Sequence, residues 1–242
     1  MTEKEFISNC VSLFELNSLP CSEEQANTLF LLTERMLEVN KSMNLTAIKE
    51  EKAIILRHYV DCALIIEHIP QGAKIIDVGC GAGFPTLPLA IFRPDLSITA
   101  LDGTAKRINY VAETAKLLGL ENITAIAARA EELAHKDGYR EGFDIATARA
   151  VAALPVLCEL CLPYVKVGGM MLAMKAQQAD SELALSGNCI RLCGGDAPSV
   201  ISRGLVSDNG DIEERKLILI KKSKKTQPLY PRHFSKISKK PL

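Results

Sequence analysis

The spacing of hydrophobic residues changes once along the chain, near residue 70. Before that point, apolar residues recur every three or four positions between Leu29 and Val39, which predicts a helix with one buried face. Thr2 and Ser22 are each followed three positions later by Glu or Gln, a pattern typical of the first turn of a helix. We therefore expect an N-terminal helical segment over residues 1–69.

Beyond Lys74, short apolar runs of strand length alternate with longer stretches of helical periodicity. Such alternation indicates a parallel β-sheet with helices on both faces. Near the end of the chain, Asn209 and Gly210 separate two further strand patterns, and this pair favours a tight hairpin turn. The predicted core is an α/β fold over residues 70–222, followed by a tail over 223–242. Strands are expected at 74–78, 97–101, 123–127, 143–148, 170–175, 200–206 and 216–220, and core helices at 86–92, 104–118 and 154–165.

Composition places the chain among ordinary globular proteins, with 48% hydrophobic and 24% charged residues. Its longest apolar runs are interrupted by Lys, Asp or Pro before they reach membrane-spanning length. The first nine residues are polar and mixed in charge, unlike a secretory signal. We expect a cytoplasmic protein with no membrane partner.

Four of the eight cysteines have a spacing that resembles a set of zinc ligands: Cys158, Cys161, Cys189 and Cys193. Two of them, however, fall inside an apolar helical pattern, where cysteine serves as a small hydrophobic residue. Thiols in reducing compartments also stay reduced. The sequence therefore favours reduced core cysteines and no bound metal.

The formal net charge is zero, but the charges are unevenly distributed. Ten Lys or Arg and no acidic residue lie between Arg215 and Leu242, which leaves 19 basic against 29 acidic residues in the rest of the chain. A basic tail on an acidic body suggests a polyanionic partner such as nucleic acid. The alternative is a solvated, mobile terminus. The candidate RNA-binding residues are Lys221, Lys222, Lys224, Lys225, Arg232, Lys236, Lys239 and Lys240.

A glycine-rich loop, Asp77–Pro85 (DVGCGAGFP), follows the first core strand. Glycine lets a backbone turn sharply and approach a ligand closely, and ligands of open α/β sheets bind at the carboxyl ends of strands. The spacing is G-x-G-x-G rather than the dinucleotide pattern G-x-G-x-x-G, which favours an adenosylmethionine donor over NAD. Asp77 is placed to face the cationic amino group of that donor. A glycine turn without a ligand is the remaining alternative.

Asp102 ends the second predicted strand, about twenty residues beyond the glycine loop. A carboxylate at this place can accept hydrogen bonds from both hydroxyls of a ribose. Both NAD and adenosylmethionine contain that ribose, so Asp102 does not decide between them. The alternative reading is a helix cap before Lys106 and Arg107.

An ordered series of short motifs between about residue 40 and residue 242 resembles a known family. The series is similar to that of the bacterial small-subunit ribosomal RNA guanine-N7 methyltransferases, also called methyltransferase G or glucose-inhibited division protein B. Thr86, Gly103 and Ala176 stand where that family usually has Gly, Ser and Gly. The matching motifs are Asn44-Leu45-Thr46, Arg57-His58-x-x-Asp61, the glycine loop with Phe84-Pro85, Leu101-Asp102, Lys106-Arg107, Arg129-Ala130-Glu131-Glu132, Phe143-Asp144, Thr147-Ala148-Arg149-Ala150, Gly168-Gly169, Lys175 and Tyr230-Pro231-Arg232.

The resemblance implies a class I S-adenosylmethionine-dependent methyltransferase fold. Such a fold is Rossmann-like, with a mostly parallel seven-stranded sheet and a terminal antiparallel hairpin, here preceded by the helical segment. The implied cofactor is S-adenosyl-L-methionine, and the implied partner is 16S ribosomal RNA or the small ribosomal subunit. The implied reaction is methyl transfer to N7 of one specific guanine.

The same resemblance assigns roles to individual positions. It places Gly79 and Phe84 against the donor and Asp102 on the ribose. The adenine is expected beside Ala130 and Glu131, and Arg149 falls on an arginine of the cofactor pocket that also faces the RNA. The full set of candidate cofactor-binding residues is Asp77, Gly79, Gly81, Phe84, Asp102, Ala130, Glu131 and Arg149.

Guanine N7 already carries an in-plane lone pair, so the implied reaction needs no base to remove a proton. We expect catalysis by proximity and alignment, with no acid–base catalytic residue. His58 and Asp61 lie three positions apart and hence on one helix face. They either form a local ion pair or cap, or they shape the RNA or donor pocket.

Other functions share these signals. A class I methyltransferase acting on a small molecule or protein would use the same donor loop without needing the basic tail. A non-catalytic RNA-binding or assembly protein on the same fold would not need an intact donor site. An NAD-linked oxidoreductase is disfavoured by the glycine spacing.

Overall fold

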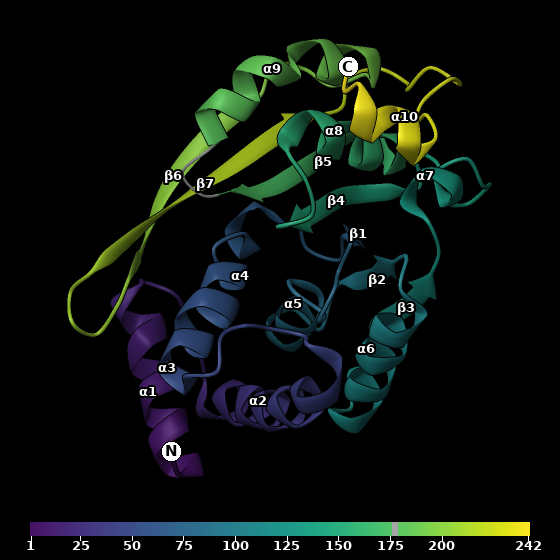
Figure 1. Ribbon diagram of the computed structural model, residues 1–242. Coiled ribbons are helices and arrows are strands. Elements are labelled where there is room, and N and C mark those ends of the chain that lie inside the picture. Colours follow the sequence, from purple (N-terminus) through teal and green to yellow (C-terminus); the bar gives the residue numbers. More distant parts are fainter. Residues whose placement is uncertain (176–178) are drawn as a thin grey trace.

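The computed structural model describes residues 1–175 and 179–242 (Figure 1). Within that part of the chain, seven strands form one sheet in the order β3-β2-β1-β4-β5-β7-β6. Strands β1 to β5 run parallel to one another, and β7 runs antiparallel between β5 and β6. This confirms the predicted fold class. The strands are β1 (Lys74–Val78), β2 (Ser97–Asp102), β3 (Ile123–Ala127), β4 (Phe143–Arg149), β5 (Val165–Lys175), β6 (Ser199–Val206) and β7 (Ile212–Lys221).

Helices cover both faces of the sheet (Figure 1), and each face has its own hydrophobic cluster. One face packs against α1 (Glu3–Leu16), α2 (Glu23–Met43), α5 (Thr86–Phe92) and α6 (Ala105–Leu117). The other packs against α7 (Ala130–Leu133), α8 (Leu154–Cys161), α9 (Ala179–Leu192) and α10 (Phe234–Lys239). A parallel sheet requires this double cover because both of its faces are apolar.

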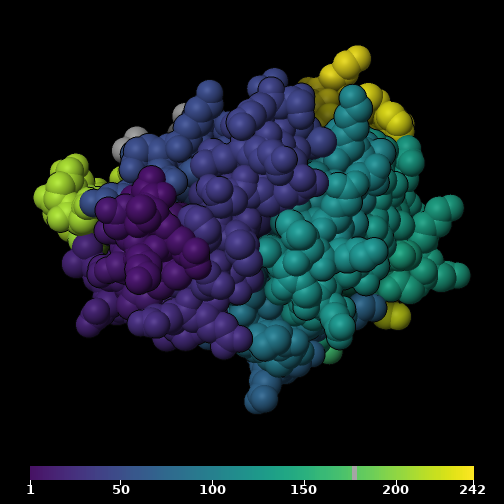
Figure 2. Space-filling view, turned by 90° about the horizontal axis from the view of Figure 1, so that it is seen from below, coloured from purple at the N-terminus to yellow at the C-terminus, as the bar shows by residue number. Residues whose placement is uncertain are grey.

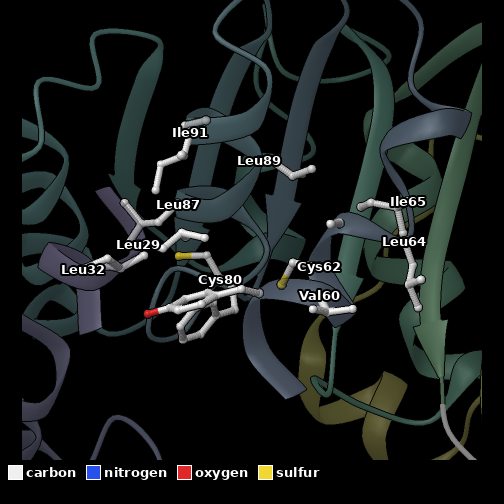
Figure 3. Close-up of a cluster of buried hydrophobic side chains, with 14 of the residues drawn as sticks. Leu29, Leu32, Val60, Cys62, Leu64, Ile65, Cys80, Leu87, Leu89 and Ile91 are labelled. Carbon is white, nitrogen blue, oxygen red and sulfur yellow. The ribbon is translucent and has the colours of Figure 1, made fainter. Parts of the chain in front are cut away.

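The N-terminal helices share the hydrophobic cluster of the sheet. Both predicted capping boxes are present, on Thr2 and Ser22. Figure 3 shows Leu29 and Leu32 of α2 beside Leu87 of α5, and all three side chains are fully buried. Burying one such side chain contributes about 1.5–3 kcal/mol. In Figure 2 the N-terminal segment, purple to blue, lies directly against the teal middle of the chain.

Between α2 and β1 the chain forms α3 (Glu51–Ile54), a π-helical turn η1 (Ile55–Val60), α4 (Asp61–Ala63) and a 3₁₀ turn η2 (Ile66–His68). A π-helical turn inserts an extra residue into the helix and is frequent at functional sites. Here it carries Arg57 and His58 toward the sheet.

The helix expected over 154–165 is shorter than predicted. It ends at Cys161, a 3₁₀ turn η3 (Leu162–Tyr164) follows, and β5 already begins at Val165. Pro163 lacks an amide hydrogen and cannot donate to the carbonyl oxygen four residues earlier, so the α-helical bonding ends and the 3₁₀ turn follows. The glycines expected before β5 instead lie inside it, where the pairing register with β4 shifts.

The basic tail is packed against the body, so the alternative of a mobile terminus is wrong. Arg140 donates hydrogen bonds to the carbonyl oxygens of Thr226, Gln227 and Tyr230. Ile237 of α10 is fully buried in the cluster that includes α8.

The prediction of core cysteines is confirmed. Cys158, Cys161, Cys189 and Cys193 are free, buried thiols in the hydrophobic cluster on the α8 face. Among the described residues, no group of three or more His, Cys, Asp or Glu side chains could hold a metal ion. A search of the same residues finds no helix long and apolar enough to cross a membrane.

Candidate functional site

A cavity of about 1340 Å³ opens at the carboxyl ends of β1, β2, β4 and β5. Pockets for one small ligand are typically about 300–1,000 Å³, so this cavity has room for a donor and part of a second molecule. It is lined by Leu45, Arg57, His58, Asp61, Gly79, Cys80, Gly81, Ala82, Phe84, Asp102, Arg107, Arg149, Ala150, Val151, Met174, Lys175, Ala179, Glu182, Ile212, Glu213, Glu214 and Arg215.

The glycine loop is held in place by the end of β2. The amides of Gly79 and Cys80 donate to the carbonyl oxygen of Leu101, and the amide of Gly81 donates to Asp102 Oδ2. Gly79 and Gly81 have φ angles of 79° and 55°, which side-chain-bearing residues rarely adopt. A Cβ on Gly79 would also lie 2.7 Å from Val151 Cγ2. Both glycines are therefore required by geometry.

Asp102 lies in the cavity with each carboxylate oxygen already anchored once. Oδ2 accepts from Gly81 at 3.1 Å and Oδ1 accepts from the Thr104 amide at 2.8 Å. Thr104, not Asp102, stands at the N-cap of α6. A carboxylate offers about four acceptor positions, so Asp102 can still accept bonds from ligand hydroxyls.

Asp77 lies beneath the glycine loop and does not line the cavity. Its Oδ2 accepts from the Thr86 hydroxyl at 2.7 Å, whereas Oδ1 has no hydrogen-bond partner among the described residues. Complete burial raises the pKa of Asp77 to about 6, although the hydrogen bonds from Thr86 oppose the rise. Thr86, one of the departures from the family pattern, begins α5 as expected and holds this carboxylate. Ala176, another departure, lies outside the described residues.

Phe84 packs against two polar side chains on the cavity wall, His58 and Arg149. The His58 ring stacks on Phe84 with centroids 4.5 Å apart and an interplanar angle of 14°. The Arg149 guanidinium lies over the Phe84 ring, 5.0 Å from its centroid. His58 and Arg149 also contact each other, so both lie on the same side of Phe84, the predicted donor contact, and hold its ring in place.

The protonation of His58 follows from its two partners. Arg149 can only donate, so His58 Nδ1, 3.1 Å from the guanidinium, must accept. Nε2 then carries the hydrogen and donates to Thr46 Oγ1 at 2.9 Å. Burial, together with the charge of Arg149, lowers the pKa of His58 to about 3. His58 is neutral in this site.

Asp61 completes the cluster around Arg149. Its Oδ2 pairs with Arg149 at 3.1 Å, and its Oδ1 accepts from Arg215 of β7 at 3.0 Å. Glu213, also on β7, bonds both Arg215 and Arg57. His58 and Asp61 therefore do not pair with each other. They hold Arg149 jointly and line the cavity, so the local ion pair is wrong, and their part in shaping the RNA or donor pocket stays a prediction.

Ala130 and Glu131, the predicted adenine contacts, do not line the cavity. The hydroxyl of Tyr164 donates to the Ala130 carbonyl oxygen at 2.6 Å, and Glu131 is buried beside Arg129. Their role at the adenine stays a prediction. By contrast, Gly79, Gly81, Phe84, Asp102 and Arg149 all meet in the cavity.

The prediction that Lys222 binds RNA is wrong. Its side chain is only 1% exposed, and its ammonium donates to the Leu162 carbonyl oxygen and the Thr226 hydroxyl, both at 2.7 Å. Glu141 lies 3.2 Å away and balances the charge. Burial lowers the pKa of this lysine. Lys222 is a structural cation.

The other tail residues lie away from the cavity. Lys221 pairs with Met170 near the start of β5, whereas Lys175 at the cavity end of β5 pairs with Lys216. The tail therefore begins at the opposite end of the sheet. Arg232 is also engaged, because it donates two hydrogen bonds to the fully buried Glu159. The exposed members are Lys221, Lys224, Lys225, Lys236, Lys239 and Lys240.

Several cavity residues had no role in the sequence prediction. Glu182, Glu213 and Glu214 are examples, and the sequence includes Arg215 only as part of the basic tail. No local motif marks them. The one available signal is the acidic pair Glu213 and Glu214 directly before the last basic stretch.

Known proteins of similar sequence cover nearly the whole chain. Residues 25–205 match the GidB family, described as rRNA small subunit methyltransferase G. A relative named "Ribosomal RNA small subunit methyltransferase G" from Lactobacillus delbrueckii subsp. bulgaricus is 38% identical over 242 residues, covering 98% of this chain and 99% of the relative. A protein of the same name from Clostridium perfringens is 40% identical over 223 residues, covering 91% and 92%.

Solved structures share the fold at low sequence identity. A putative O-methyltransferase from Klebsiella pneumoniae has a TM-score of 0.54 at 16% identity, covering 90% of this chain and 99% of that one. An O-methyltransferase from Thermotoga maritima has a TM-score of 0.51 at 13% identity, covering 79% and 73%. These similarities concern the fold alone. The family match and the full-length relatives decide the membership: this chain belongs to the rRNA small subunit methyltransferase G family.

Proposed function

We propose that this protein transfers a methyl group from S-adenosylmethionine to N7 of one guanine in 16S ribosomal RNA. One observation carries the proposal. The glycine loop and Asp102 are hydrogen-bonded to each other on the wall of a cavity that has room for a donor and part of a second molecule. Family membership supplies the RNA substrate, because the relatives are named for the small subunit. The choice of guanine N7 follows the resemblance to the family.

The residues present fit the donor. Gly81 leaves open space above the loop, since an added Cβ would meet nothing closer than 4.0 Å, whereas the corresponding position at Gly79 is occupied by Val151. Asp102 presents free acceptor positions for ribose hydroxyls. Asp77 lies beneath the glycine loop with its Oδ1 unpartnered among the described residues, and its negative charge would act on the ammonium group of the donor from below that loop. When bound, S-adenosylmethionine supplies a methyl group activated by an adjacent sulfonium.

The chain's own residues act by holding and orienting. No side chain needs to remove a proton, because N7 of guanine is already a free nucleophile. Phe84, His58 and Arg149 hold one another in place on the cavity wall, and the reactants can be aligned against them. Asp61 neutralises Arg149, and Asp102 adds a negative charge, so the cavity tolerates the positive charge that moves onto the purine.

The RNA must present its guanine unstacked, because side chains cannot enter the deep major groove of an RNA helix. Arg57 and Arg107 line the cavity with about half of each side chain exposed, and we propose that they contact phosphates nearest the target. The exposed tail lysines are proposed to contact RNA farther away. Such contacts give affinity and steering without sequence specificity.

The test is methyl transfer from labelled S-adenosylmethionine to small-subunit RNA, or to particles that lack the modification, followed by mapping of the labelled nucleotide. We expect N7-methylguanine at a single site, with transfer abolished by Asp102→Ala. Transfer to particles but not to naked RNA would identify the assembled subunit as the substrate.

Other outcomes point elsewhere. Donor binding without transfer to any RNA form would favour a small-molecule or protein substrate. Failure to bind the donor at all would contradict the enzymatic assignment and leave a non-catalytic RNA-binding role.

A further inference from the structure

The loop between β4 and α8, residues 150–153, lies directly over the glycine loop. Val151 reaches toward Gly79 so closely that a Cβ there would lie 2.7 Å from it. Val151 is nevertheless 39% exposed, so hydrophobic packing of its side chain does little to fix the position of the loop. The preceding Ala150 has a φ of 56°, which is strained for a residue with a side chain. This loop needs an external restraint to keep its position.

Two charged side chains supply that restraint. Lys175 Nζ, at the end of β5, donates to the Ala152 carbonyl oxygen at 2.5 Å. Glu182 Oε2, on α9, accepts from the Leu154 amide at 2.7 Å. The same Oε2 lies 2.8 Å from Lys175 Nζ, and the two side chains are 11% and 18% exposed. The ion pair between Lys175 and Glu182 thus holds the chain at two places, the Ala152 carbonyl oxygen and the Leu154 amide.

The contact with Leu154 also replaces a missing helix cap. Ala153 stands at the N-cap of α8 and has no side-chain oxygen to satisfy the first amides. Glu182 supplies an acceptor and a negative charge from a different helix. The start of α8, and the loop that leads into it, therefore depend on a residue about thirty positions away in the chain.

We propose that Lys175 and Glu182 are positioning residues that hold Val151 against Gly79 and so fix the cavity wall along which methyl donor and acceptor base are aligned. The inference rests on the proposed function. Neither residue reacts. A shift of about 1 Å in such a wall can cost about 100-fold in rate, because methyl transfer requires close alignment.

The test compares Glu182→Ala with Asp180→Asn, a matched change on the same helix. Asp180 is exposed and pairs with Lys216, and it makes no bond to Lys175, Ala152 or Leu154. For Glu182→Ala we expect kcat to fall about 10- to 100-fold, while the donor Kd changes by less than about threefold. The Leu154 amide should exchange its hydrogen at least about tenfold faster. Asp180→Asn should leave all three quantities unchanged.

Two further variants separate positioning from folding. Glu182→Gln keeps an acceptor for Leu154 and should restore most of its protection and part of kcat. Lys175→Met frees Ala152 but keeps the bond between Glu182 and Leu154, so kcat should fall while Leu154 stays protected. These differences between kcat and Leu154 protection can be measured even if Glu182→Ala is too unstable to assay.

A wild-type kcat in Glu182→Ala, or unchanged exchange at Leu154, would overturn the clamp. An equal loss of kcat in Asp180→Asn and Glu182→Ala would also overturn it. If the wild-type protein transfers no methyl group to small-subunit RNA, the proposed function fails instead. In that case the exchange of the Leu154 amide still decides whether the clamp exists.

Discussion

Asp61 and Arg149 form a largely buried ion pair, 3.1 Å long, that joins the start of α4 to the end of β4. The second oxygen of Asp61 holds Arg215 of β7. One carboxylate thus connects the N-terminal helices, the centre of the sheet and the terminal hairpin. All three segments line the cavity.

Replacing Asp61 with Asn should therefore destabilise the whole protein. The change leaves the largely buried Arg149 guanidinium without its counter-charge and leaves Arg215 with Glu213 alone, at a cost of about 3–5 kcal/mol. Urea denaturation of the wild-type and variant proteins measures the difference in free energy of unfolding. Lys52→Gln, which removes only an exposed partner of Asp208, is the control and should change that energy by less than about 1 kcal/mol. Equal effects in the two variants would contradict the structural role of Asp61.

His58 should make stability depend on pH. Its native pKa of about 3 lies below the ordinary value of 6.5, so the unfolded chain binds the proton more readily. The stability it contributes is complete above pH 6.5 and is lost progressively as the pH falls toward 3. Between pH 6.5 and 5 the loss amounts to at most about 2 kcal/mol.

The measurement is the free energy of unfolding at several pH values for wild-type and His58→Gln proteins. Glutamine can still accept a hydrogen bond from Arg149 but does not titrate, so its curve should be flatter in this range. Asp77 acts in the opposite sense, since its pKa is raised to about 6 and its contribution is lost as pH rises through that value. Parallel curves for the two proteins would show that His58 is not the titrating group.

Thr86→Val should weaken donor binding at neutral pH through Asp77. Valine has nearly the same shape but lacks the hydroxyl that bonds Asp77 Oδ2, so the pKa of Asp77 should rise above its present value of about 6. Donor affinity should then fall at pH 7 and recover at higher pH. Calorimetric titration with S-adenosylmethionine between pH 6 and 9 measures the shift. Thr86→Ser keeps the hydroxyl and should match the wild-type profile.

Replacing Lys222 should change stability and not RNA binding, whereas replacing the exposed tail lysines should change RNA binding and not stability. Lys222→Met should lower the melting temperature, because Glu141 and the Leu162 carbonyl oxygen lose their partner, and should leave the salt dependence of RNA binding unchanged. A triple change of Lys236, Lys239 and Lys240 to Ala should do the reverse. The slope of log affinity against log salt should fall by about 2 if those lysines contact single-stranded phosphates. An unaltered slope would remove the tail from the RNA-binding surface.

The sequence by itself determined those features of this protein that depend on residues close together in the chain, namely helix faces, helix starts and turns. The period of the apolar positions between Leu29 and Val39 set the buried face of α2, and Thr2 and Ser22 marked two helix starts correctly. The glycine loop and Asp102 were identified because backbone turns and strand ends leave local signals. Pro163 is also a local signal, because it lacks the amide hydrogen that would extend α8, but the apolar periodicity over 154–165 conceals it.

Only the tertiary structure decided which charges meet. Lys222 sits in a basic run that reads as solvated, yet the fold buries it against Glu141. The pairing of Asp61 with Arg149, and of Lys175 with Glu182, joins segments that no local pattern connects. The physical reason is that periodicity and turn chemistry act over a few residues. The energy of a buried charge depends on whatever partner the packing of distant segments brings within about 4 Å.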